Sequence, residues 1–280
     1  MTDYSLAYLT SVPLSPADAL ILAGKLGYRY TGARIAPASP GGEFHPLVTD
    51  AAMRRQTIAR NKDSGAAIFD VEIVRLAADF KADTFAPFLE TCGALGARAI
   101  LVAGDDPDEG RLTASFAAFC DAAAEYDLTA DLEFMPWTRV PNARAALRVV
   151  SNAGRPNGRI LVDTLHAGRS GTTLADIAAI PRAMLGYAQL CDAPGEIPPT
   201  HEGLIHTARN ARLLPGEGGI DLVGMLSQLP VDLPISLELP HAERLPALGP
   251  EQWGRQALAA AKIVVAKRDA IVANMKAGPR

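Results

Sequence analysis

Four polar side chains stand late in otherwise apolar stretches between residues 128 and 240, and their types are those that bind metal ions. They are Glu133 in LEFMPW, Asp163 in LVDTLH, Gln189 in YAQLCD and Glu238 in SLELP. Buried carboxylates repel one another and resist ionisation unless a cation compensates them. Three carboxylates beside one amide therefore favour a divalent cation over a structural network of ion pairs.

Other side chains near these four could contact a substrate. His166 follows Asp163 by three positions, and from there an imidazole can reach the same pocket as a substrate-binding or proton-transferring group. Arg169 in GRSG is either part of a loop or a contact for an anionic substrate group. Trp137 either packs in the core or forms an apolar wall against a substrate.

Such residues need a scaffold that brings the ends of four strands together, and the periodicity of the chain predicts one. Apolar runs of strand length alternate eight times with helical segments. The first helical segment, SPADALILAGKLG, has Ser15 as a candidate N-cap and Gly27 as a stop signal. Strands rich in Ile, Val, Leu and Ala without polar alternation are typical of a parallel sheet covered on both sides.

Eight such units in 280 residues predict an α/β fold, a single (β/α)8 TIM barrel. No Gly/Ser-rich linker divides the chain, so we expect residues 1–280 to form one domain. In a barrel of this kind the carboxyl ends of the strands meet at one mouth, where the four polar residues would converge.

The stretch FDVEIVRL places Asp70 and Glu72 on one face of a strand, because side chains alternate with a period of two. Arg75 falls on the opposite face, so strand period gives no pair between Glu72 and Arg75. We expect a structural role for the two carboxylates, with cationic partners from neighbouring strands.

The segment from Asp192 to Asp221 is far longer than a usual connection between a strand and a helix. It includes Arg212 and ends near the glycines of PGEGG, which give conformational freedom. We expect a mobile lid whose arginines become ordered on substrate.

Composition excludes several classes of partner. The net charge is −4 and no run of Lys or Arg occurs, so neither nucleic acid nor an anionic membrane is expected as a partner. The three cysteines show no CxxC spacing, which speaks against a disulfide framework or a thiolate metal site. No leader-like or membrane-length apolar stretch is present, so we expect a cytoplasmic protein, and a homo-oligomer is compatible with the sequence.

Taken together, the motifs LEFMPWT, VDTLH, LCDAP, PGEG and SLELP resemble those of the xylose isomerase-like TIM barrel superfamily. That superfamily includes ketose 3-epimerases, inosose and 3-dehydroshikimate dehydratases, and apurinic endonucleases. The resemblance implies that Glu133, Asp163, Gln189 and Glu238 are the metal ligands, with Gln189 where a histidine is usual. An all-oxygen set favours Mn²⁺ or Mg²⁺ over Co²⁺ or Zn²⁺.

The same resemblance implies roles for further residues. Arg212, shortly before PGEG, would lie over a bound sugar, although a solvated loop arginine is the equal alternative. Glu133 and Glu238 would transfer protons, and His166 would hold a substrate oxygen.

The predicted function is a metal-dependent isomerase or epimerase of a small carbohydrate or polyol, acting beside a carbonyl through a metal-stabilised enediolate. The alternative is a metal-dependent dehydratase (lyase) of a cyclic keto-polyol such as an inosose or 3-dehydroshikimate. A catalytically silent sugar-binding barrel is a third hypothesis. Apurinic endonuclease chemistry fits least, because it uses a histidine-rich trinuclear zinc cluster and this chain has five histidines.

Overall fold

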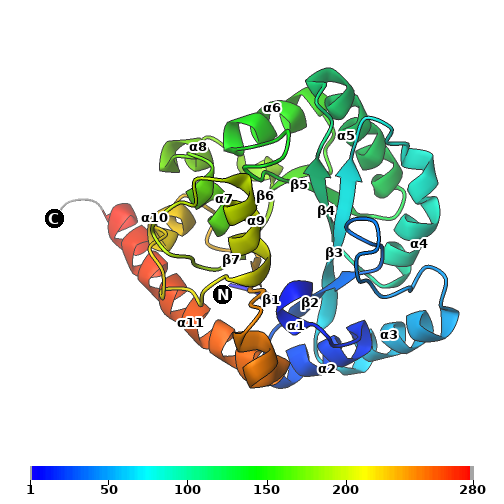
Figure 1. The fold of residues 1–280 in the computed structure, drawn as a ribbon, viewed down its shortest axis with the longest axis horizontal. Coiled ribbons are helices and arrows are strands. Elements are labelled where there is room, and N and C mark those ends of the chain that lie inside the picture. The colour runs from blue at the N-terminus through cyan, green and yellow to red at the C-terminus, as the bar shows by residue number, and fades with distance from the viewer. Residues whose placement is uncertain (1, 278–280) are drawn as a thin grey trace.

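The computed structural model describes residues 2–277, in which eight strands close into a barrel (Figure 1). Each strand pairs in parallel with the next along the chain, and β8 returns to pair with β1. The strands are β1 (Tyr4–Leu6), β2 (Tyr30–Arg34), β3 (Ala67–Leu76), β4 (Ala99–Gly104), β5 (Thr129–Glu133), β6 (Gly158–Asp163), β7 (Leu185–Leu190) and β8 (Ile235–Leu237).

Helices cover the strands, and most of them form an outer ring around the barrel (Figure 1). They are α1 (Tyr8–Ser11), α2 (Pro16–Leu26), α3 (Ala51–Asp63), the 3₁₀ turn η1 (Ala82–Phe85), α4 (Ala86–Ala94), α5 (Glu109–Ala124), α6 (Ala143–Ala153), α7 (Thr164–Arg169), α8 (Leu174–Ala178), the 3₁₀ turn η2 (Arg182–Met184), α9 (His201–Asn210), α10 (Leu222–Ser227) and α11 (Arg244–Ala277). The parallel order and the alternation of strands with helices confirm the predicted (β/α)8 barrel.

The local signals for α2 act as the sequence predicts. The hydroxyl of Ser15 accepts a hydrogen bond from the backbone N–H of Asp18, and Pro16 occupies the first helical turn. Gly27 ends the helix with φ of 84°, a left-handed conformation that costs glycine little.

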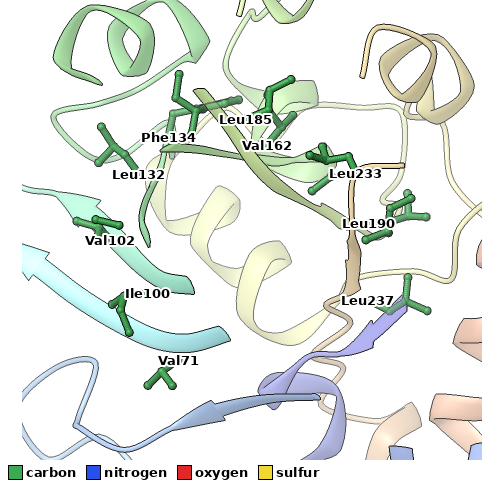
Figure 2. Packing of buried hydrophobic residues seen from close by; sticks show 14 of the residues in the cluster. Val71, Ile100, Val102, Leu132, Phe134, Val162, Leu185, Leu190, Leu233 and Leu237 are labelled. Carbon is green, nitrogen blue, oxygen red and sulfur yellow. The ribbon is translucent and has the colours of Figure 1, made fainter. Parts of the chain in front are cut away.

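The main apolar core lies between the strands and the helices. Figure 2 shows part of it, including Val102, Leu132, Val162 and Leu237. Phe116 of α5 belongs to the same cluster, which therefore joins strand residues to the helices that cover them. A smaller cluster of aromatic and aliphatic side chains is separate from it: Tyr30, Phe69, Ala99, Leu101, Leu161 and Tyr187.

Two segments differ from the simplest interpretation of the sequence. The apolar run YSLAYLTSV forms only the three-residue β1 before it turns into α1. The hydroxyl of Thr10 explains the turn, because it donates to the carbonyl of Leu237 and accepts from the N–H of Leu239, both at 2.7 Å. The expected lid segment contains α9, whose N-cap Thr200 accepts from the N–H of Gly203.

The last helix, α11, is broken near its start. Gly249 has φ of 74° inside it, and Pro250 follows, so two helices meet at a kink there. Across residues 2–277, no helix is both long enough and apolar enough to cross a membrane.

Candidate active site

The barrel brings the four predicted ligand residues to one end. Glu133 ends β5, Asp163 ends β6, Gln189 lies near the end of β7, and Glu238 directly follows β8. Asp163 and Gln189 face each other in the register of β6 with β7. All four are buried, with exposed fractions between 0% and 4%, so their charges are shielded from bulk water.

Three side chains at this end form a compact group of potential metal donors: Glu133, Asp163 and His166. One ligand atom from each lies within 4.8 Å of the other two. The Nε2 of His166 is 3.5 Å from Oε1 of Glu133 and 3.9 Å from Oδ2 of Asp163. His166, expected to contact the substrate, therefore stands among the donors themselves.

The position of His166 follows from how α7 begins. Asp163 is the N-cap of this helix, and its Oδ1 accepts hydrogen bonds from the N–H groups of Leu165 and His166 at 2.6 and 3.2 Å. The cap places His166 in the first helical turn, beside the carboxylate that caps it. Trp137 meets the imidazole edge-on, with the ring centres 5.0 Å apart, and limits its rotation.

Burial controls the protonation of this donor group. It lowers the pKa of His166 to about 4, so the imidazole is neutral near pH 7 and keeps a lone pair for a ligand. Burial, and then the charges of Asp163 and Glu238, raise the pKa of Glu133 well above its usual value. Burial also disfavours ionised Asp163, but the charge of Arg212, the interaction with His166 and the hydrogen bonds from both residues together hold the pKa of Asp163 below its usual value.

Arg212 lies between two of the predicted ligands. Its Nη1 is 2.6 Å from Oδ2 of Asp163, and its Nη2 is 2.7 Å from Oε2 of Glu238. Its Nε donates to the carbonyl of Ala208 at 2.8 Å, and only 3% of the residue is exposed. The side chain is thus a buried partner of two carboxylates rather than a solvated loop arginine.

Glu238 and Gln189 form the other side of this arrangement. The Nε2 of Gln189 donates to Oε1 of Glu238 at 3.0 Å. Within residues 2–277, the buried Oε1 of Gln189 has no hydrogen-bond partner. Burial raises the pKa of Glu238 to about 8 despite the opposing charge of Arg212, so this carboxyl exchanges its proton near neutral pH.

The donor group fits one divalent cation. Among the described residues, Oε1 of Glu133 has no hydrogen-bond partner although it is buried, as expected of an atom that serves as a ligand. Arg212 contacts both Asp163 and Glu238, and Gln189 also donates to Glu238, so the four-residue ligand set expected from the sequence stays a prediction. The structure adds His166 to the potential donors beside Glu133 and Asp163, and the Oε1 of Gln189 is without a hydrogen-bond partner among the described residues.

A cavity of about 250 Å³ opens onto this site. Its lining includes both proton-transfer candidates and the three residues expected to bind substrate: Glu133, Glu238, Trp137, His166 and Arg212. The volume is below the range typical of drug-sized ligands, and it suits a small polar molecule.

One cation at the mouth was missed by sequence reasoning. Arg34, the last residue of β2, has its Nη2 2.8 Å from Oε1 of Glu72. This contact confirms that Glu72 has a cationic partner on a neighbouring strand, while Arg75 pairs instead with Asp105 at 2.8 Å. The sequence pattern that could have identified Arg34 is the same one that identified the carboxylates, namely a charged residue at the end of an apolar strand.

Asp192 anchors the ends of the segment expected to be a lid. Its carboxylate accepts from the N–H groups of Gly216, Gly218 and Ile220 at 2.9 to 3.2 Å. A Cβ on Gly218 would lie 2.2 Å from a backbone oxygen, so only glycine allows this close approach. Arg169, considered for substrate binding, donates to the carbonyl of Pro194 and supports the same segment.

Comparison with known proteins agrees with this architecture. The model of the xylose isomerase-like TIM barrel family matches residues 76–263, and the chain belongs to this family. No curated protein sequence matches the chain significantly.

Solved structures share the fold at low sequence identity. An IOLI protein crystallised with a zinc atom has a TM-score of 0.80 at 18% identity, over 95% of this chain and 99% of that one. The D-allulose 3-epimerase of Methylomonas sp. in complex with D-allulose gives 0.67 at 15%, over 94% and 96%. A fusion of a xylose isomerase-like TIM barrel with 4-hydroxyphenylpyruvate dioxygenase gives 0.80 at 20%, over 94% of this chain but 42% of the fusion.

Proposed function

We propose that this member of the xylose isomerase-like TIM barrel family is a divalent-metal-dependent isomerase or epimerase of a small sugar or keto-polyol. The observation that carries the proposal is the buried group of Glu133, Asp163 and His166, which could hold one metal ion beside the cavity. Family neighbours that contain zinc or bind D-allulose support the same chemistry.

Two carboxylates and one imidazole would hold the cation. When bound, a divalent ion supplies Lewis-acid polarisation of a substrate carbonyl, which acidifies the neighbouring C–H bond. This mixed oxygen and nitrogen set suits Mn²⁺, Co²⁺ or Zn²⁺, whereas Mg²⁺ prefers oxygen ligands alone. The Oε1 of Gln189, which has no hydrogen-bond partner within residues 2–277, is a candidate for a further ligand.

Glu238 is the proposed base that removes the proton from carbon. A carboxyl with a pKa of about 8 holds and releases protons near the working pH, as general acid–base catalysis requires. Gln189 and Arg212 each bind one of its oxygens and fix its orientation toward the cavity. Glu133 lines the same cavity and is the second proton-transfer group.

His166 and Trp137 shape the wall of the cavity. His166 is neutral and held by Trp137, and Trp137 also offers an apolar surface to the carbon skeleton. Return of the proton to the opposite face of the same carbon is epimerisation, and return to the neighbouring carbon is isomerisation.

Dehydration of a cyclic keto-polyol is the second candidate, and one observation favours it. With a pKa of about 8, Glu238 can hold the proton that it removes from carbon and donate it to a departing hydroxyl group. Loss of water after the same proton removal would make the enzyme a lyase.

A substrate panel in D₂O tests the proposal. Ketoses, inososes and 3-dehydroshikimate are incubated with the protein and Mn²⁺, and the products are analysed by NMR and mass spectrometry. We expect solvent deuterium to enter one substrate at the carbon beside its carbonyl, without loss of water. Deuterium uptake with loss of water would identify the dehydratase, and no uptake in any substrate of these classes would argue against both.

A further inference from the structure

Arg212 and the donor group share one carboxylate. Oδ2 of Asp163 lies 2.6 Å from Nη1 of Arg212 and 3.9 Å from Nε2 of His166, so the same oxygen faces the guanidinium and the donor imidazole. The other oxygen, Oδ1, caps α7. Both oxygens of Asp163 are thus engaged before any metal binds.

The guanidinium also contacts Glu238, a mouth carboxylate that lies outside the donor group. Nη2 of Arg212 contacts Oε2 of Glu238, and Gln189 occupies the other oxygen. Both oxygens of Glu238 are therefore occupied by side chains of the protein before any metal binds.

Electrostatics make this arrangement relevant to metal binding. A guanidinium is always protonated in proteins, and this one is buried, so its positive charge is only weakly screened. A divalent cation bound to Asp163 would stand next to that charge and compete with it for the same oxygen. The repulsion acts on the metal and hardly at all on a neutral sugar.

We propose that Arg212 is a built-in competitor cation, which occupies Asp163 and Glu238 and lowers the affinity of the donor group for divalent metals. The inference rests on the proposed function, because it concerns the metal of that same site. As a consequence, the guanidinium compensates the charges of the carboxylates when no metal is bound. A metal would be held reversibly, and Glu238 would stay available as a base.

Metal titration of Arg212→Met tests this directly. Titration calorimetry with Mn²⁺ and with Zn²⁺ alone, on chelator-treated protein, should give at least about tenfold tighter binding for the variant than for the parent. The melting temperature of the variant should fall in EDTA and recover on metal addition by more than that of the parent. Arg212→Lys, which keeps the charge, should retain weak binding.

Arg209→Met is the matched control. Arg209 lies three residues earlier, lines the same cavity and is exposed, and it carries the same charge but forms no ion pair within residues 2–277. Its replacement should change metal affinity less than threefold.

A second pair of variants covers the case in which Arg212→Met fails to fold. Glu238→Gln is compared with the double variant Arg212→Met/Glu238→Gln. In the double variant, removal of the guanidinium leaves no unpaired carboxylate at position 238. The double variant should bind metal at least about tenfold more tightly than Glu238→Gln.

Equal or weaker binding after removal of Arg212, in either comparison, would overturn the competitor role and leave the metal centre standing. Absence of metal binding to every variant and to the parent would overturn the metal centre as well.

Discussion

Neighbouring residues on the same three strands differ sharply in what surrounds them. The pairs are Leu132 and Glu133, Val162 and Asp163, and Leu237 and Glu238. All six are buried, but the apolar members belong to the cluster between strands and helices, and the acidic members meet at the barrel mouth. Burial of the first kind stabilises the fold, whereas burial of the second kind costs stability unless a cation compensates it.

Arg212 explains why the mouth tolerates these charges. Two of the three carboxylates contact its guanidinium, while Glu133 has a strongly raised pKa instead. One residue along a strand thus separates a position selected for packing from a position selected for chemistry. Substitutions on the two sides should accordingly affect different measurements.

Glu238→Gln should have the largest effect, and on turnover. The amide keeps the shape and can still accept from Arg212, but it cannot take a proton from carbon. We expect kcat to fall by about 10²- to 10⁴-fold, with a melting temperature close to that of the parent. Steady-state kinetics and thermal unfolding check this, and a fall of less than tenfold would remove Glu238 as the base.

Leu132→Ala should have the opposite profile. Removal of a fully buried leucine leaves a cavity in the outer core, and we expect a loss of about 3 kcal/mol in the free energy of unfolding. Turnover per folded molecule should change only a few-fold, although Glu133 is the next residue. Urea unfolding measures the loss of stability, and kinetics at urea concentrations below the unfolding transition measure turnover. An inactive but stable variant would contradict the separation between core positions and mouth positions.

The fold could be predicted from the sequence more completely than the contacts within the candidate site. The eight repeats and the polar residues at strand ends predict the barrel and the meeting of Glu133, Asp163 and Glu238, because strand periodicity and parallel order fix where those side chains lie. The ion pairs of Arg212 were not predictable, since it follows a long connection with no regular period. The donor role of His166 depends on the helix cap formed by Asp163, which the DxxH spacing alone does not reveal.

Asp70→Asn should reveal a buried carboxyl without a compensating cation. Burial, and then the charge of Glu72, raise the pKa of Asp70 well above its ordinary value, and within the described chain neither oxygen has a hydrogen-bond partner. The folded state therefore keeps this proton at pH values where the unfolded chain has lost it. Stability contributed by the neutral form is present at low pH and declines as pH rises from about 4 through the raised folded value.

The asparagine variant cannot ionise and should lose less stability between pH 5 and pH 8 than the parent, by on the order of 1 kcal/mol or more. Melting temperatures at the two pH values measure the difference. Identical pH dependence in both proteins would mean that Asp70 does not carry this proton.

Gln189→His should have the smallest effect. An imidazole at this position would add a nitrogen donor beside the site, which Co²⁺ and Zn²⁺ prefer to an amide oxygen. We expect the ratio of Co²⁺ to Mg²⁺ affinity to rise about three- to tenfold, with the fold retained. Calorimetry on metal-free protein tests it, and an unchanged ratio would place Gln189 outside the ligand set.

Hydrogen exchange at the carbon next to the substrate carbonyl tests the central claim most directly. NMR in D₂O, with a substrate identified from the panel and Mn²⁺ present, compares the parent with Glu238→Gln and Leu237→Ala. Deuterium should enter with the parent and with the folded fraction of Leu237→Ala at similar rates, and at least about 100-fold more slowly with Glu238→Gln. Equal exchange in the parent and Glu238→Gln would contradict proton transfer by the mouth carboxylate.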